Sequence, residues 1–444
     1  MPTSDVADIR AWLESRIGAG VRLGLSTCSE MLERLGNPQA DFPSIHVAGT
    51  NGKGSLCAHL SALGSMNGEL IGLYTSPHLV TVEERARIDG RPVSAEEFDS
   101  CLEEVREAGR IEPEILPTYF ETTFLASMLA FSRNNVDRAV IETGLGGRLD
   151  STRLVEADIC AITTISMDHS EVLGDTLPKI ATEKAGIHRP GVPLLCLDHE
   201  DEEVRAAIEG IAGEDVVWVP RASEDAQEVA RSMASVIGSR IGWKDMETEV
   251  VWPGRSLDRI NWSGAELVLS AAHNSESLSH DLGRLGSERH VLVVGMTQKE
   301  DLSESIEPLL RSEGRIRTIV TEVHGGRNPS VPAEHLSEYL SGHSEIAPLL
   351  IVDPIEAIDA ASKVANEEGC IVYMTGSVYL VGHAIVAGVR ALELVEAQRA
   401  VIQRAGEPVP PRHQPQLPRA VAAVHGPQLR EHHVRLVRDQ QPVA

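Results

Sequence analysis

The stretch Ile45-His-Val-Ala-Gly-Thr-Asn-Gly-Lys-Gly-Ser55 is the strongest indication of fold in this 444-residue chain. Residues 44–48 predict a short buried strand, and apolar residues at helical spacing follow Ser55 to about Met66. Glycines between a strand and a helix let backbone N–H groups close on phosphate oxygens at the helix N-terminus. Lys53 would then lie against the β- and γ-phosphates, with Ser55 near a phosphate or Mg²⁺. The sequence therefore predicts an ATP-using enzyme, although Gly54 separates the lysine from the hydroxyl, unlike the common phosphate-loop spacing.

Outward from this loop, strands alternate with helices along two successive stretches of the chain. In the first stretch, a helix at 118–131 lies among strands expected at 70–74, 138–142, 159–165, 193–197 and 215–219. The alternation breaks near Trp252-Pro-Gly-Arg255, and a second series of strands is expected at 266–270, 290–294, 316–321, 349–352 and 369–375. Such alternation predicts an α/β protein with parallel, doubly wound sheets.

We therefore expect an N-terminal P-loop-type parallel-sheet ATPase domain over residues 1–253, which opens with amphipathic helical spacing over about residues 4–36. A smaller Rossmann-like α/β domain is expected over residues 254–404. Residues 405–444 are rich in Pro, Gln, Arg and His, a composition that predicts a disordered tail.

Composition argues against several partners and locations. The formal charge of −26 argues against a nucleic acid or an anionic membrane as a partner. No apolar run approaches the roughly 20 residues that a membrane-spanning helix needs. The first residues, with Asp5, Asp8 and Glu14 among them, lack the basic start and apolar core of a signal peptide. The six cysteines have no metal-ligand spacing and are expected to be buried thiols, so the cytoplasm is the expected location.

Polar side chains stand at the ends of several predicted strands. Ser76 ends one strand, Glu142 ends another before a Gly-Leu-Gly-Gly turn, and His169 follows a third. Because the carboxyl ends of parallel strands meet at one sheet edge, we expect these three to converge, where a carboxylate can bind a hard cation. Plainer alternatives are a hydrogen-bonded polar residue for His169 and a solvated or ion-paired side chain for Lys184, in the helix expected at 178–185.

The phosphate loop belongs to a series of motifs that occur in one order over about residues 5–390. They are Leu35-Gly-Asn-Pro-Gln39, Tyr74-Thr-Ser-Pro-His-Leu79, Thr118-Tyr-Phe-Glu121, Glu142-Thr-Gly-Leu-Gly-Gly-Arg-Leu-Asp150, Met167-Asp-His169, Glu183-Lys-Ala-Gly-Ile187, Pro253-Gly-Arg255, Ala272-His-Asn274 and Thr375-Gly-Ser-Val-Tyr-Leu-Val-Gly382. Together these motifs resemble the Mur ligase superfamily, in its folylpolyglutamate synthase/dihydrofolate synthase branch.

The resemblance implies a set of site residues. ATP would be bound by Asn51, Gly52, Lys53, Gly54, Ser55, Arg255, Ser270, His273 and Asn274. Mg²⁺ would be bound by Ser76, Glu142 and His169, and a second Mg²⁺ by Lys184 after its carbamylation; a monovalent cation is a further candidate. The residues that carry the chemistry would be Lys53, Glu142, His169 and Lys184. Carbamylation needs a deprotonated amine, hence a lysine whose pKa is lowered by burial or by neighbouring cations.

The same resemblance implies a pterin pocket. It would be formed by Thr118, Tyr119, Phe120, Glu121, Leu149, Asp150 and Ser151, although the aromatic pair could instead belong to the core. The second domain departs from the family pattern: Ser270 stands for an Asp, Ala271 for a Gly and Ser275 for a Pro, and Asp225 is the counterpart of an Asn. The segment Thr297-Gln-Lys299-Glu-Asp301 and Arg327 are candidates for binding the amino-acid substrate or for domain closure.

The reaction implied by the resemblance is ATP-dependent amide formation. The γ-phosphate would pass to the carboxylate of dihydropteroate or a reduced folate, and the amine of L-glutamate would attack the acyl phosphate. One alternative is a Mur-type ligase acting on another pterin, a deazaflavin or a peptide. Another is a nucleotide-binding regulatory protein without ligase activity, which is favoured by Ser270 and opposed by the presence together of Lys53, Glu142, His169 and Lys184. A monomer is the expected state.

Overall fold

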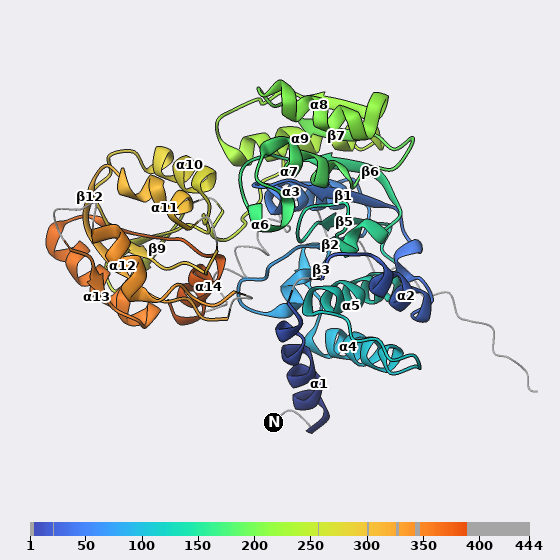
Figure 1. Cartoon of the computed structure of the whole chain (residues 1–444), viewed down its shortest axis with the longest axis horizontal. Coiled ribbons are helices and arrows are strands. Elements are labelled where there is room, and N and C mark those ends of the chain that lie inside the picture. The colour runs from blue at the N-terminus through green and yellow to red at the C-terminus, as the bar shows by residue number, and fades with distance from the viewer. Residues whose placement is uncertain are drawn as a thin grey trace, which may run out of the picture. The chain divides into compact units, whose positions relative to one another are not determined.

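The computed structural model (Figure 1) describes residues 4–20, 22–255, 257–299, 302–325, 328–341 and 347–388. These residues form two β-sheets, each covered by helices. Within these ranges no helix combines the length and the apolar character that crossing a bilayer requires. The tail expected at 405–444 and Arg327 lie outside the described residues.

The first sheet has eight strands in the order β4-β3-β2-β5-β1-β6-β7-β8. Their bounds are β1 Ser44–Ala48, β2 Ile71–Tyr74, β3 Ala86–Ile88, β4 Arg91–Pro92, β5 Arg138–Glu142, β6 Ala157–Ile162, β7 Leu194–Leu197 and β8 Val216–Val219. Neighbouring strands from β2 to β8 run parallel, as predicted. At the other edge the sheet ends in β3 and β4, two strands that the sequence did not predict, and β3 pairs antiparallel with both β2 and β4. These two strands have only three and two residues, too few to produce a recognisable pattern.

Helices cover both faces of this sheet (Figure 1). Their bounds are α1 Ser4–Ser15, α2 Ser26–Arg34, α3 Lys53–Met66, α4 Ala95–Gly109, α5 Tyr119–Arg133, α6 Ser170–Leu173, α7 Leu177–Ala185, α8 Glu202–Ala212 and α9 Ala226–Arg240. Side chains alternate between the faces of a strand, so Val140 packs in a core with α3 and α9. Its neighbour Ile141 packs in the opposite core, with residues of α1, α2, α4, α5, α7 and α8. The sheet is therefore doubly wound, with β1 in its interior.

The second sheet has six strands in the order β13-β12-β11-β14-β10-β9. Their bounds are β9 Asp258–Trp262, β10 Ala265–Leu269, β11 His290–Val294, β12 Arg315–Val320, β13 Leu349–Leu350 and β14 Ile371–Thr375. All neighbours are parallel except β9, an antiparallel edge strand that the sequence did not predict.

Helices again cover both faces of the second sheet. They are α10 Ser275–Leu285, α11 Leu302–Leu310, α12 Ala333–Ser341, α13 Pro354–Glu368 and α14 Val378–Gly388. The helices α13 and α14 pack on one face and α10, α11 and α12 on the other. The expected boundary at residue 253 falls between α9 and β9, and the division into domains stays a prediction.

Candidate active site

The phosphate loop connects the carboxyl end of β1 to α3, which begins at Lys53. Gly49 has a φ of +143°, and a Cβ there would lie 1.8 Å from Thr163 Oγ1, so only glycine fits. A Cβ on Gly54 would lie 3.1 Å from the indole Nε1 of Trp252. The close approach of Trp252 therefore leaves little room for a side chain at the position between the lysine and Ser55.

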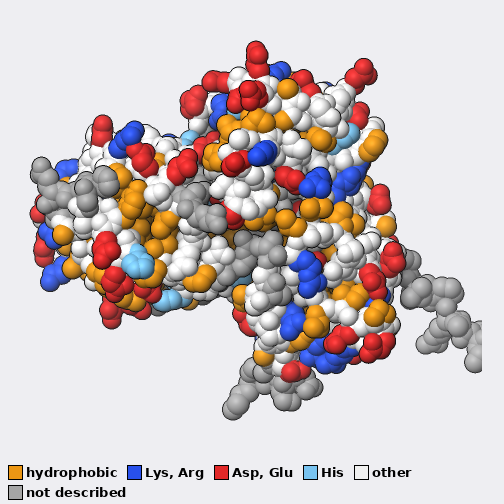
Figure 2. Space-filling view, viewed as in Figure 1, with side chains coloured by type: hydrophobic (Ala, Val, Ile, Leu, Met, Phe, Trp, Pro, Cys, Tyr) orange, Lys and Arg blue, Asp and Glu red, His pale blue; other side chains and the backbone are white. Residues whose placement is uncertain are grey.

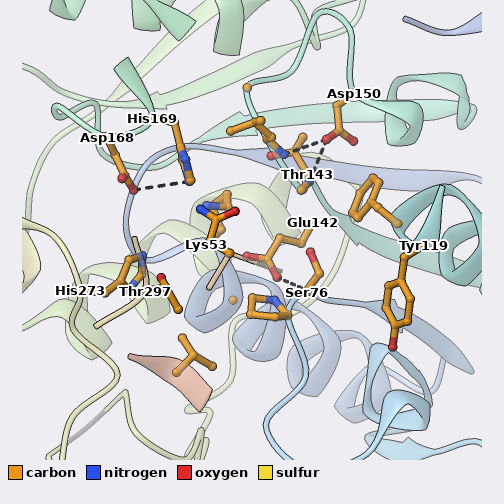
Figure 3. A pocket seen from close by; sticks show the side chains of 18 of the residues that line it. Lys53, Ser76, Tyr119, Glu142, Thr143, Asp150, Asp168, His169, His273 and Thr297 are labelled. Carbon is orange, nitrogen blue, oxygen red and sulfur yellow. Dashed lines mark hydrogen bonds and ion pairs between the residues drawn. The ribbon is translucent and has the colours of Figure 1, made fainter. Parts of the chain in front are cut away.

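One pocket brings together most of the predicted site residues (Figure 3). Its wall includes Gly52, Lys53, Gly54, Ser76, Tyr119, Phe120, Glu121, Glu142, Leu149, Asp150, Ser151, His169, Lys184, Arg255 and His273. The predicted residues Asn51, Ser55, Thr118, Ser270 and Asn274 are not part of this wall. The strands β2, β5, β1 and β6 are adjacent in the sheet, which is why the segments that follow them meet at this pocket.

Glu142 ends β5 and its side chain is buried in the pocket wall, with 4% of the residue exposed. The backbone N–H of Ser76 donates a hydrogen bond to Glu142 Oε2 over 3.0 Å, a contact visible in Figure 3. Burial raises the pKa of Glu142, although nearby Lys53 and the Ser76 N–H act in the opposite direction. Burial destabilises the ionised form of this carboxylate, and a bound cation would stabilise it again. The Glu142 carboxylate is therefore well suited to bind a cation.

Lys184 is the second lysine of the pocket and is 4% exposed. Its Nζ donates a hydrogen bond to Gly49 O over 2.8 Å, which ties α7 to the start of the phosphate loop. Burial and then the charge of Lys53 lower the pKa of Lys184 to about 7, while Asp168 and Asp150 oppose the shift. An amine with this pKa is neutral in a large fraction of molecules near neutral pH, as the predicted carbamylation requires.

Asp168 and His169 lie beside one another in the upper left of Figure 3. His169 Nε2 is 4.0 Å from Asp168 Oδ2. Burial acts to raise the pKa of Asp168, but His169, His273 and Lys299 together hold it below its ordinary value. Burial also lowers the pKa of His273 to about 4, so the ring of His273 is neutral at pH 7. Asp168 thus contributes a fixed negative charge to the pocket.

The residues expected to hold Mg²⁺ all belong to the pocket wall. The buried Glu142 carboxylate and the Ser76 hydroxyl are oxygen ligands of the kind that Mg²⁺ prefers, whereas the imidazole of His169 is not. No group of three or more His, Cys, Asp or Glu side chains with metal-binding geometry occurs among the residues that the structure describes. These residues therefore fit a Mg²⁺ that takes much of its coordination from phosphate oxygens and water, not an all-protein cage.

The predicted pterin residues line another part of the same pocket. Asp150 is 6% exposed, and its Oδ2 accepts hydrogen bonds from the backbone N–H groups of Gly144 and Leu145 at 3.0 and 2.8 Å. The ring of Tyr119 lies under the guanidinium of Arg85, 5.1 Å from the ring centroid. This wall combines aromatic faces with buried polar groups, the arrangement that a flat, hydrogen-bonding ring needs.

The contacts of Ser270 reveal a carboxylate that sequence reasoning missed. Ser270 Oγ donates a hydrogen bond to Asp281 Oδ2 on α10 over 2.6 Å. The negative charges of Glu142 and Asp281 both act on Arg255, whose pKa is lowered by burial. Asp281 therefore supplies a negative charge close to Ser270 and Arg255. No motif contains Asp281, and only the packing of α10 against β10 brings it there.

Comparisons with known proteins agree with this geometry. The dihydrofolate synthase/folylpolyglutamate synthase of Bacillus subtilis (strain 168) is 29% identical over 428 residues, which is 84% of this chain and 97% of that protein. A solved structure of E. coli FolC in complex with DHPP and ADP has a TM-score of 0.73 at 26% identity, covering 88% of this chain and 98% of that chain. A bifunctional folylpolyglutamate synthase/dihydrofolate synthase with Mn, AMPPNP and L-glutamate bound has a TM-score of 0.72 at 26% identity, covering 85% and 97%. No protein-family model matches the chain.

The fold and the pocket, taken with these relatives, define the class of protein: the chain is an ATP-dependent ligase with a Mur ligase-like fold of two α/β sheets. Within that class, the chain is similar over most of its length to dihydrofolate synthase/folylpolyglutamate synthase relatives. The sequence-based recognition of this family is confirmed.

Proposed function

We propose that this chain joins L-glutamate to the carboxylate of dihydropteroate, of a reduced folate, or of both, at the expense of ATP. The observation that carries the proposal is the single pocket in which the phosphate loop, Glu142 and the wall around Tyr119 and Asp150 meet. A shared pocket is what the reaction requires, since the γ-phosphate and the acceptor carboxylate must lie within reach of each other.

Each part of the pocket has a role in this reaction. The loop N–H groups and Lys53 would hold the β- and γ-phosphates at the N-terminus of α3, and Arg255 would neutralise charge on the phosphates. The acceptor ring would lie against Tyr119 and Phe120, beside the buried carboxylate of Asp150. Little covalent chemistry then falls on the protein, so positioning and charge neutralisation would supply most of the rate.

Ser76, Glu142 and His169 would hold Mg²⁺ in this scheme. When bound, the ion would screen the charge of the phosphates and so permit the approach of the acceptor carboxylate. A monovalent cation is a further candidate at the same pocket.

Lys184 would carry a carbamate and help to bind a second Mg²⁺. The neutral amine would attack CO₂, an N–C bond would form, and the proton released from nitrogen would leave the pocket. Burial of Lys184 and its pKa of about 7 support this modification. The reaction turns a buried cation into an anion, which suits a pocket that must hold divalent cations.

The attacking amine would come from L-glutamate bound near the second sheet. Thr297, Gln298 and Lys299 line that side of the pocket, and Lys299 Nζ donates to His273 O over 2.7 Å. Water must be kept from the acyl phosphate, which it would hydrolyse, so the groups from both sheets would need to close over the substrates.

The proposal extends to the class of substrate, the cellular compartment and the oligomeric state. The substrates would be small molecules, since the −26 charge and the acidic side chains spread over the face in Figure 2 disfavour nucleic acid. All six cysteines are free thiols, which supports a reducing compartment such as the cytoplasm. A monomer remains our prediction for the oligomeric state.

The test is a substrate screen with purified enzyme, in which dihydropteroate and tetrahydrofolate are each incubated with ATP and labelled glutamate. We expect labelled amide and ADP in equal amounts with at least one acceptor. Lys53→Ala and Glu142→Gln should each abolish the reaction, whereas Lys179→Ala, which removes an exposed lysine paired with Asp175, should not. Normal ligation by Lys53→Ala would overturn the assignment of the site.

A further inference from the structure

The helix α10 presents a polar stripe to the first sheet's loops and helices. Glu276, His280 and Arg284 follow one another at intervals of four residues, so they share one face of the helix. Leu278 and Leu285 are buried in the core under the second sheet. The buried leucines hold α10 against the second sheet, so the residues of the polar stripe are not needed for that packing.

Glu276 makes the closest contacts of this stripe. Its Oε2 accepts hydrogen bonds from Ser166 Oγ at 2.7 Å, from Thr164 Oγ1 at 3.3 Å and from the side-chain amide of Asn51. Asn51 belongs to the phosphate loop, and the other two residues follow β6, the strand next to β1. A single carboxylate oxygen thus binds three donors from the two segments that flank the phosphate site.

A second contact reinforces the position of Asn51. Asn274, the N-cap of α10, donates from Nδ2 to Asn51 Oδ1 over 3.0 Å. The side chain of Asn51 is therefore held at both its oxygen and its nitrogen by residues at the start of α10. This explains why Asn51, predicted as an ATP-binding residue, lies behind the pocket wall.

The far end of the stripe touches the start of α9. His280 Nε2 is within hydrogen-bonding distance of Glu224 O at 3.1 Å, and Arg284 lies 3.5 Å from Asp225, which caps α9. The ion pair is one-third exposed at both side chains, so it adds little by itself. The contacts of Glu276 are charge-assisted hydrogen bonds and are the stronger part of the stripe.

We propose that Glu276 is a positioning residue that ties α10 to the phosphate loop, so that the loop and the second sheet's side of the pocket are held together during catalysis. The inference rests on the proposed function, since it takes the pocket to be the site of acyl phosphate formation. None of Glu276, Asn51, Thr164 and Ser166 lines the pocket, so Glu276 acts through the loop and touches no substrate. Its loss would loosen the closed pocket and admit water to the acyl phosphate.

The experiment measures ADP release and labelled glutamate incorporation in the same reaction of the full-length enzyme. The variants are Glu276→Ala, Glu276→Gln and the control Glu334→Ala. Glu334 is exposed and is the second residue of α12, as Glu276 is of α10, so the control removes the same charge from the same position of a helix.

We expect the wild type and Glu334→Ala to form one amide per ADP. In Glu276→Ala, ligation should fall about tenfold or more, the loss expected when one or two charge-assisted hydrogen bonds are removed. The ratio of ADP to amide should also rise above one, because water competes for the intermediate. Glu276→Gln keeps an acceptor oxygen, so its ligation rate and its ratio of ADP to amide should lie between those of the wild type and Glu276→Ala.

Two results would overturn the inference. If Glu276→Ala ligates glutamate at the wild-type rate, Glu276 has no role in the reaction. If its ligation rate is lowered but the ratio of ADP to amide stays at one, Glu276 serves only to stabilise the fold. Release of ADP by the wild type without amide would instead contradict the proposed function. In that case, a comparison of the rates of ADP release by Glu276→Ala and Glu334→Ala would still show whether the contact of Glu276 with the phosphate loop matters.

Discussion

Lys184 offers a quantitative prediction, because the structure gives its amine an unusual pKa. An ordinary lysine with a pKa of ~10.4 is neutral in roughly one molecule in three thousand at pH 7. With a pKa of about 7, Lys184 would be neutral in about half of the molecules at that pH, roughly a thousandfold more. Only the neutral amine attacks CO₂. The neutral fraction falls from about nine-tenths at pH 8 to about one-tenth at pH 6, so carbamate should be lost as the pH falls through this window.

The assay follows the carbamate carbon by NMR in enzyme equilibrated with ¹³C-labelled bicarbonate, and measures ligation in parallel. A resonance should be present at pH 8, decline towards pH 6 and be absent in Lys184→Met, which keeps a side chain of similar length without an amine. Lys179→Ala should retain the resonance, because Lys179 is exposed. A resonance that persists in Lys184→Met, or none in the wild type at pH 8, would refute the reasoning.

Two further predictions concern the nucleotide. Gly54→Ala places a Cβ 3.1 Å from Trp252 Nε1, so the loop or the indole must move and the KM for ATP should rise several-fold in initial-rate measurements. Gly210→Ala, in an open part of α8, is the control: its activity should be unchanged, and thermal unfolding should show a free energy of unfolding raised by about 0.5–1 kcal/mol. An unchanged KM for ATP in Gly54→Ala would contradict the packing argument. Asp281→Asn removes the charge-assisted hydrogen bond that Ser270 Oγ donates to Asp281, and the loss of this support for Ser270 should weaken ATP binding about tenfold in calorimetry, roughly the worth of one charged hydrogen bond. Equal affinities for the two proteins would show that Asp281 serves the fold alone.

Sequence patterns located the central strands best. The strands expected at 44–48, 138–142 and 290–294 coincide with β1, β5 and β11, because uninterrupted buried strands bounded by turns have few alternative interpretations. The edge strand β9 was missed because its residues alternate in exposure and lie beside a tight Ser-Gly turn, which gave no apolar run. The helical spacing over residues 4–36 proved to be two helices, α1 and α2, with a 3-10 turn between them.

The convergence of the candidate site residues could be predicted from the sequence wherever the sheet topology positions a residue. Ser76, Glu142 and His169 follow adjacent or nearby strands, so their meeting in one pocket could be expected from the alternation of strands and helices. Glu276 and Asp281 could not be found in this way. Each lies on a helix and reaches its partners through the packing of segments distant in the chain, a tertiary property with no local pattern.

The central claim is that phosphate passes from ATP to the carboxylate of the acceptor before the amide forms. The most direct test uses an acceptor whose carboxylate carries ¹⁸O, with ATP, L-glutamate and the wild-type enzyme, and analyses the inorganic phosphate by mass spectrometry. The acyl phosphate route predicts one ¹⁸O in each phosphate released with an amide. Phosphate without ¹⁸O, in a reaction that still forms labelled amide, would contradict the account.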